Sequence, residues 1–303
     1  FTPSLEAGML AAIKAAEDAV AAVPGEPAML DALSVVLNMG MLALGRDCLF
    51  NDPRMIAYPE RALDVAQQIY DLQPRNREAK GVLAEMYSAL AQTHAALGQT
   101  AEARVAFLDA YRLRVELADT DPSNQFFAAQ VMKARLDLQE LRTHDPDPTP
   151  PSFIEREALT DLGSETGRQH AKEAGLEVFW LLRFAEEALV NTKDRVIAIQ
   201  YARNVVRLHE AAPTTEANLL VSLLGETLYR SLTKPVEEEF LLSRSLLLPD
   251  GQDCRSRYTR RLAFALLGDD AASQAEKRAL DDRNATFTGM GFYERLIAEM
   301  NGS

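Results

Sequence analysis

Side chains that commonly carry chemistry are few in this sequence, and they are widely spaced. The two cysteines, Cys48 and Cys254, lie far apart and outside any CxxC pair, so we expect two reduced thiols and no structural zinc. Neither a GxSxG nucleophile motif nor a glycine-rich phosphate loop followed by Lys-Ser/Thr occurs. The four histidines match no HExxH or similar metal-binding pattern; they are His94, His144, His170 and His209. The sequence therefore predicts no catalytic residue, no metal site, no cofactor and no enzymatic activity.

Clustered charges offer two further candidates. The acidic run Glu237–Glu239 follows Pro235 in the first turn of an expected helix, where negative charge complements the helix dipole, so we interpret it as structural. Glu186 and Glu187 are expected on a solvated helix face.

Four arginines lie close together near the C-terminal end, at Arg255, Arg257, Arg260 and Arg261. On a helix, Arg257 and Arg261 are four residues apart and share a face. Such a face can bind an acidic or phosphorylated partner through paired N–H donors, or it can pair with the chain's own acids. We name Arg257 and Arg261 as candidate partner-binding residues.

Composition excludes several classes of function. The chain of 303 residues is 47% hydrophobic and 25% charged, which is typical of folded soluble proteins. Its formal net charge of −13 argues against nucleic acid and anionic membranes as partners, because both are bound by clustered Lys and Arg. The most apolar stretch, residues 29–44, is interrupted by Asp31, Ser34 and Asn38, so no membrane span is expected. No signal peptide is recognisable, and we expect a cytoplasmic protein.

Helical signals dominate the chain, and no strand-like alternation bounded by turns stands out. Pro59 is expected in the first turn of its helix, where a missing N–H costs little. About a dozen short amphipathic helices in succession are typical of a stacked array of helix pairs. The predicted helices span residues 5–23, 28–44, 59–72, 76–97, 101–118, 123–142, 153–163, 165–190, 194–211, 215–232, 235–247, 253–267, 270–283 and 291–300.

A proline-rich segment, His144-Asp-Pro-Asp-Pro-Thr-Pro-Pro151, breaks the helical pattern. Repeated prolines forbid a continuous helix and give a stiff, extended connector. We therefore predict an N-terminal helical-repeat half over residues 1–143, a linker over 144–152 and a C-terminal helical-repeat half over 153–303. The linker is either a domain boundary or a spacer within one superhelix.

Residues 76–122 carry the clearest repeat. Its first helix has Tyr87, Leu90 and Ala91, and after Leu97-Gly98 its second has Phe107 and Ala110. These positions resemble the tetratricopeptide signature, in which small residues let two antiparallel helices approach closely. Residues 194–285 resemble the same family in a more degenerate form, and the spacing between units departs from the family's regular period of about 34 residues.

The resemblance implies an all-α fold, a right-handed superhelix of antiparallel helix pairs, that acts as a protein–protein interaction scaffold or adaptor. In such an array the first helix of each pair lines an inner groove that binds a partner peptide or domain. The matching positions are Glu85, Ser88 and Gln92 in the first repeat, and Asn218, Ser222 and Glu226 in the later unit. The acidic members predict a partner segment that carries Lys or Arg.

Two other functions remain open from the sequence. The absence of an initial Met and the likeness to long bacterial repeats favour a regulatory or sensor region of a larger signalling enzyme, a kinase or caspase-like protease. A small-molecule-binding helical domain is the third reading, which a deep apolar pocket would favour and a shallow open groove would not. The apolar segment Gly289–Met300 is expected to cap the array or to be buried against a second copy in a homo-oligomer.

Overall fold

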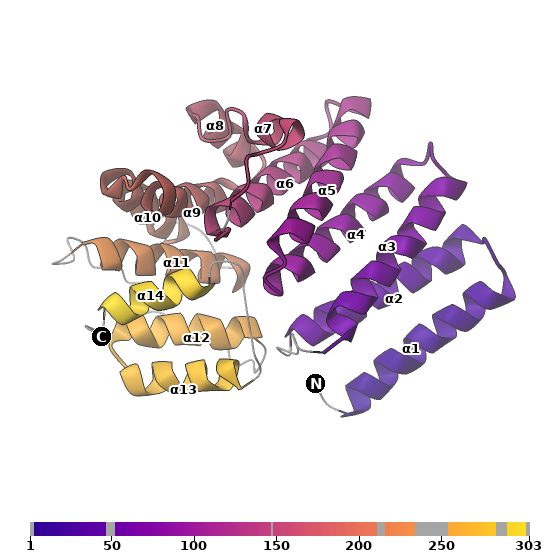
Figure 1. Ribbon diagram of the computed structural model, residues 1–303, viewed down its shortest axis with the longest axis horizontal. Coiled ribbons are helices and arrows are strands. Elements are labelled where there is room, and N and C mark those ends of the chain that lie inside the picture. The colour runs from indigo at the N-terminus through magenta and orange to yellow at the C-terminus, as the bar shows by residue number, and fades with distance from the viewer. Residues whose placement is uncertain are drawn as a thin grey trace. The chain divides into compact units, whose positions relative to one another are not determined.

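A computed structural model describes residues 3–46, 52–146, 148–210, 216–233, 254–282 and 290–300 (Figure 1). Within these ranges the protein is all-α, with fourteen α-helices and one short π-helical segment, and no strand. The chain divides into two compact units, residues 1–134 and 135–303. Each unit is described by itself.

Unit 1 consists of helices packed in chain order. α1 contacts α2, α2 contacts α3, α3 contacts α4 and α4 contacts α5, so consecutive helices form antiparallel pairs (Figure 1, indigo to magenta). The first half of α6 completes this unit. The helices are α1 (Pro3–Ala22), α2 (Pro27–Arg46), α3 (Arg54–Leu72), α4 (Arg77–Ala96), α5 (Thr100–Thr120) and α6 (Gln125–His144).

The pair α4–α5 shows how local sequence produces the fold. The side chain of Asn76 caps α4 by accepting a hydrogen bond from the Glu78 backbone N–H at 2.9 Å. Gly98 adopts φ +74° in the connecting turn, a left-handed conformation that glycine adopts without steric cost. Ala91 and Ala110 are fully buried and Phe107 is nearly so, which confirms the close helix–helix contact that their spacing predicts.

Helix α2 is the most apolar element of unit 1. Its core face, which includes Leu33, Leu37 and Leu44, is buried where α2 meets α1 and α3. Over Pro27–Gly45 the helix is long and apolar enough to cross a membrane by length and composition alone. Core helices of soluble proteins and signal sequences share those two properties.

Unit 2 begins with the second half of α6 and continues through shorter helices. α9 contacts α8, α10 and α11, while α11 also contacts α10, α12 and α14, and α12 contacts α13. The helices are α7 (Phe153–Leu159), α8 (Glu165–Glu173), α9 (Glu177–Glu187), the π-helical η1 (Ala188–Thr192), α10 (Arg195–Glu210), α11 (Glu216–Leu232), α12 (Cys254–Leu267), α13 (Asp270–Asp281) and α14 (Met290–Met300).

The division between the units falls inside α6 rather than at the proline-rich segment. The C-terminal half of α6 belongs to unit 2 because its side chains bond there. Arg135 donates to the carbonyl oxygens of Ala158 at 2.6 Å and Thr160 at 2.5 Å, and Arg142 pairs with Glu155 at 3.4 Å. The proline-rich segment therefore connects two parts of unit 2.

Three predicted helices differ from the structure by more than two residues at a boundary. α7 ends at Leu159 rather than at residue 163. The single helix expected over residues 165–190 is two helices, because Gly175 adopts φ +72° and ends α8. α3 begins at Arg54, so Pro59 lies inside it rather than in its first turn. The helix expected over residues 235–247 and the run Glu237–Glu239 lie outside the described residues.

Cys254 is buried at the start of α12 and is disulfide-bonded. The prediction of two reduced thiols is therefore wrong for Cys254. Cys48 lies outside the described residues.

Candidate functional site

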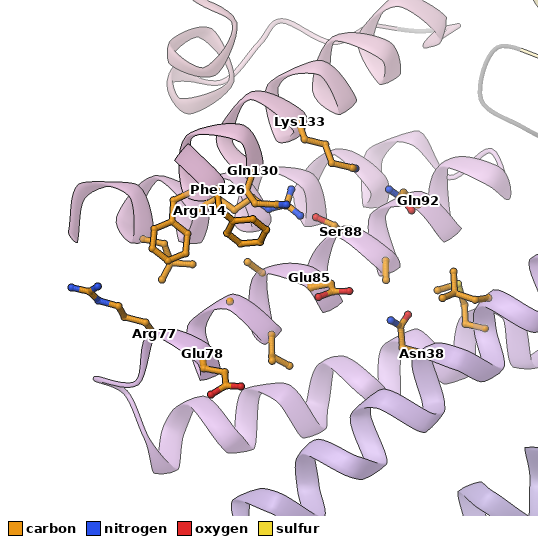
Figure 2. Close-up of a pocket in the computed structure, with 18 residues that line it drawn as sticks. Asn38, Arg77, Glu78, Glu85, Ser88, Gln92, Arg114, Phe126, Gln130 and Lys133 are labelled. Carbon is orange, nitrogen blue, oxygen red and sulfur yellow. The ribbon is translucent and has the colours of Figure 1, made fainter. Parts of the chain in front are cut away.

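A groove in unit 1 is the main candidate site. It has a volume of about 780 Å³ and is lined by residues of α2, α4 and α6, with Arg114 and Leu117 contributed by α5. Figure 2 shows its side chains converging from these helices. Most of the lining residues come from α2, α4 and α6, which alternate along the chain with α3 and α5.

The groove has apolar side chains that the fold does not bury. Leu42 on α2 is 57% exposed, and Phe126 on α6 is 64% exposed. Val82 and Phe127, both half-buried, add apolar surface to the groove. Large exposed apolar side chains that gather in a concavity mark a binding surface, because water solvates them at a free-energy cost that a ligand relieves.

Three predicted partner-binding residues lie together in this groove. Glu85, Ser88 and Gln92 all line it from α4, about one turn apart (Figure 2). Glu85 and Gln92 are exposed, whereas Ser88 is 5% exposed. The Ser88 hydroxyl has no hydrogen-bond partner within the described part of the chain.

Charges of both signs surround these residues. Glu78 and Arg77 lie at one end of the groove, and Lys133 lies on α6 beyond Ser88 (Figure 2). Arg77 also pairs with Asp121 at 3.8 Å. Arg114 also lines the groove and adds a cationic side chain that is only 6% exposed.

Sequence reasoning missed the contributions of α2, α5 and α6. The repeat resemblance concerned residues 76–122 and predicted only the polar face of α4. Asn38 and Phe126 reach the same groove from helices that are distant in the chain, and no local pattern marks them.

The residues predicted from the later repeat are placed differently. Ser222 and Glu226 on α11 are both 0% exposed, so neither faces an open groove. Glu226 pairs with Arg230, one turn further along the helix, at 2.6 Å. The Asn218 side chain lies outside the described residues. The structure therefore assembles the predicted groove residues of α4 but not those of α11.

The arginine cluster on α12 forms ion pairs within unit 2. Arg257 bonds to Glu276 at 3.1 Å, and Arg260 bonds to the same carboxylate at 2.7 Å. Arg261 is 3% exposed in its side chain and pairs with Glu294 at 2.8 Å. Arg257 and Arg261 thus hold α13 and α14 against α12, the second of the two roles that the sequence allowed. The Arg255 side chain lies outside the described residues.

A buried polar network in unit 2 is the other concentration of chemistry-bearing side chains. At its centre, Glu186 on α9 is 0% exposed, which contradicts the expectation of a solvated helix face. It accepts a hydrogen bond from the Tyr293 hydroxyl of α14 at 2.5 Å and from Arg183 at 3.0 Å, and its carboxylate lies 3.4 Å from Nε2 of His144. Arg183 also pairs with Glu140 at 2.7 Å.

The pKa values of the two carboxylates in this network, Glu186 and Glu140, are shifted in opposite directions. Burial raises the pKa of Glu186, but Arg183, His144 and Tyr293 together outweigh burial and hold that pKa at about 2. Burial also raises the pKa of Glu140, and Arg183 only partly offsets it, so that pKa is about 7. Burial and the neighbouring Glu186 raise the pKa of the Tyr293 hydroxyl well above its ordinary value.

No group of three or more His, Cys, Asp or Glu side chains able to hold a metal ion occurs among the residues that the structure describes. Comparison of the chain with protein-family models, with curated proteins and with solved structures found no match. The tetratricopeptide resemblance therefore rests on the residues of this chain alone.

Proposed function

We propose that this protein is an interaction scaffold in which the groove of unit 1 binds a peptide segment of a partner protein. The observation that carries the proposal is the pair of exposed apolar side chains, Leu42 and Phe126, in one concavity with the exposed polar side chains of Glu85 and Gln92. In this reading the pairs of unit 1 are tetratricopeptide-like repeats, and α2, α4 and α6 are the inner helices of a superhelix.

The expected partner segment combines apolar and basic side chains. An apolar side chain buries the surface of Phe126, and a Lys or Arg faces the exposed carboxylate of Glu85. Lys133 and Arg114 add positive charge to the same groove, so the partner is expected to carry a basic residue at one position rather than throughout.

A displayed library of random 16-residue linear peptides tests the proposal. Peptides enriched on the wild-type protein are synthesised, and their dissociation constants are measured by fluorescence anisotropy. Phe126→Ala is expected to weaken binding about tenfold or more, because truncation of a large aromatic contact at an interface commonly costs more than 1 kcal/mol.

Phe153→Ala is the matched control for this experiment. Phe153 is 72% exposed on α7 and does not line the groove, so its truncation removes an equally exposed ring elsewhere. Peptide binding should not change in this variant. Equal affinity for Phe126→Ala and wild type, or no enrichment of any peptide, would overturn the proposal.

A small organic ligand is the second candidate for the same groove. Its volume of about 780 Å³ lies within the range of about 300–1,000 Å³ that is typical of small-molecule sites. Thermal-shift screening with a metabolite library separates the two candidates: a metabolite that raises the melting temperature of wild type but not of Phe126→Ala would favour the small ligand.

A further inference from the structure

We infer that the exposed face of α2 binds α2 of a second copy of this chain, with the two helices antiparallel. The inference goes beyond the proposed function and does not rest on it. Its evidence is the spacing of the exposed side chains of α2, their sizes and the near absence of charge among them.

Helix α2 is apolar on two faces, and unit 1 covers one of them. One face is buried where α2 meets α1 and α3. On the other face, Val35 is 49% exposed, Met39 62% and Leu42 57%. A helix that is apolar all round is normally covered all round, so this face marks a surface for another molecule. Its exposed apolar residues, which we name the α2 seam, are Ala28, Ala32, Val35, Met39 and Leu42.

The spacing of the α2 seam fits a second helix as the covering element. Its residues follow one another in steps of four, three, four and three. This alternation is the repeat of a two-helix coiled coil, in which each seam side chain inserts between four side chains of the facing helix. The α2 seam therefore has the pattern that another helix reads.

The sizes of the side chains fit a second copy in antiparallel orientation. One antiparallel register keeps the steps of three and four of the two copies in phase, and in it Ala32 faces Leu42 and Val35 faces Met39. Each layer then joins a smaller side chain to a larger one, which fills the space between the helices evenly. A parallel pair would instead place alanine against alanine at one end and leucine against leucine at the other.

The distribution of charge favours the same arrangement. The formal net charge of −13 makes two copies repel over most of their surfaces, but Asp31 is the only charged side chain between Pro27 and Gly45. In the antiparallel register the two Asp31 side chains lie about 18 Å apart along the helix axis, beyond the screening length of about 8 Å at physiological salt. A parallel pair would bring them side by side.

A membrane fits this helix less well than a second copy does. The helix is long and apolar enough to span one, but a span would have to leave unit 1. Leu33, Leu37 and Leu44 would then lose their burial against α1 and α3. The negative net charge also disfavours anionic lipid surfaces.

The expected dimer is weak and reversible. The α2 seam is about 21 Å long and a helix is about 10 Å across, so the contact covers about 210 Å² of each copy. Stable interfaces bury about 800 Å² per partner, so we expect a dissociation constant on the order of 10–100 µM. Sedimentation velocity of the full chain, at concentrations that rise to about 200 µM, measures this equilibrium.

Met39→Glu tests whether the α2 seam forms the contact. The dimer of this variant would bury two carboxylates against apolar side chains, so its dissociation constant should rise about tenfold or more. Met39 does not line the groove of unit 1. Val105→Glu is the matched control, because Val105 on α5 is also 62% exposed, and this variant should dimerise like wild type.

A mixture of two variants tests the orientation. Val35→Lys and Met39→Glu should each dimerise poorly alone. In an antiparallel pair of one copy of each, the introduced ammonium faces the introduced carboxylate, and the other layer keeps its native Val35 and Met39. The equimolar mixture should therefore associate about tenfold or more tightly than either variant alone. A mixture that associates no more tightly would overturn the antiparallel pairing.

Three other results would overturn the inference as a whole. Wild type could remain monomeric up to about 200 µM. Met39→Glu could dimerise as tightly as wild type, which would place the contact elsewhere. Monomeric wild type could bind phosphatidylcholine vesicles while Met39→Glu does not, which would make lipid the occupant of this face.

Discussion

Removal of the Tyr293 hydroxyl tests the network that holds α14 in unit 2. Tyr293 is 2% exposed, and its hydroxyl donates to Glu186, which is 0% exposed, at 2.5 Å. A hydrogen bond to a charged group contributes about 1.5–3 kcal/mol to stability. Tyr293→Phe deletes this bond and leaves Arg183 and His144 beside the carboxylate, so we expect unit 2 to lose about 2 kcal/mol.

The only tryptophan of the chain provides the assay. Trp180 is 1% exposed on α9, its indole N–H donates to the carbonyl oxygen of Leu162 at 2.8 Å, and it lies in the same unit as the network. Its fluorescence therefore follows the unfolding of unit 2. With a urea dependence of about 2 kcal/mol per molar, a loss of 2 kcal/mol lowers the midpoint by about 1 M.

The direction of the pH dependence follows from the pKa of Glu186. Its folded value of about 2 lies below the ordinary value of 4.5, so the stabilisation is complete above pH 4.5 and is lost as the pH falls toward 2. The difference between Tyr293→Phe and wild type should therefore be largest near neutral pH and shrink in acid.

Tyr70→Phe is the matched control, since Tyr70 is half-buried in unit 1 and its ring lies 6.0 Å from the Lys80 ammonium. We expect no shift in its Trp180 transition. A midpoint for Tyr293→Phe within about 0.2 M of wild type would refute the assignment of the hydrogen bond as a stabilising contact of α14.

Two further perturbations test the packing and the charges of unit 2. Glu140→Gln should stabilise unit 2 at pH 8 by about 1–2 kcal/mol and leave its stability unchanged near pH 4.5. The folded pKa of Glu140 is about 7, so the wild-type protein loses stability as the pH rises from 4.5 through 7, and the neutral Gln side chain does not. Urea midpoints of both proteins across this pH range measure the effect, and a variant less stable than wild type at pH 8 would show that the pair with Arg183 outweighs burial. Gly225→Ala should cost about 1–3 kcal/mol, since a Cβ there would lie 2.5 Å from Cγ1 of Val205 on α10. Gly8→Ala is the control on α1, where an added Cβ meets nothing within 4 Å, and it should stabilise the protein slightly. Thermal melting compares the two variants, and equal melting temperatures would contradict the close packing of Gly225 against Val205.

Helix positions were predictable because their signals are local. Capping by Asn76 and the turn at Gly98 depend on neighbours within a few residues, and the structure places α4 and α5 within two residues of the expected ranges. The prediction of one helix over residues 165–190 was wrong, because local sequence did not reveal where that helix is interrupted. A single glycine, Gly175, is compatible with a continuous helix in sequence, and only its left-handed backbone distinguishes a break.

The surroundings of individual side chains were less predictable, because they depend on distant helices. Two adjacent glutamates, Glu186 and Glu187, indicate an exposed helix face in the sequence. In the structure, however, Glu186 is buried and bonded to Tyr293, which lies 107 residues further along the chain. Glu85, Ser88 and Gln92 were found because one helix face carries all three. The opposite wall, which includes Phe126, belongs to α6 and has no counterpart in the repeat signature.

The two concentrations of polar side chains differ in what they leave for a ligand. Glu186 lies within 3.4 Å of three donor side chains and is 0% exposed, so a substrate proton has no approach to it of the kind that general-base catalysis requires. The strongly shifted pKa of such a group is therefore better explained by structural pairing than by catalysis. The groove in unit 1 shows the opposite arrangement, since Phe126 is 64% exposed and the polar side chains of Glu85 and Gln92 are exposed as well. Binding energy is available where apolar area and hydrogen-bonding capacity are both unsatisfied in the free protein, and in the described parts of this chain that condition favours the groove.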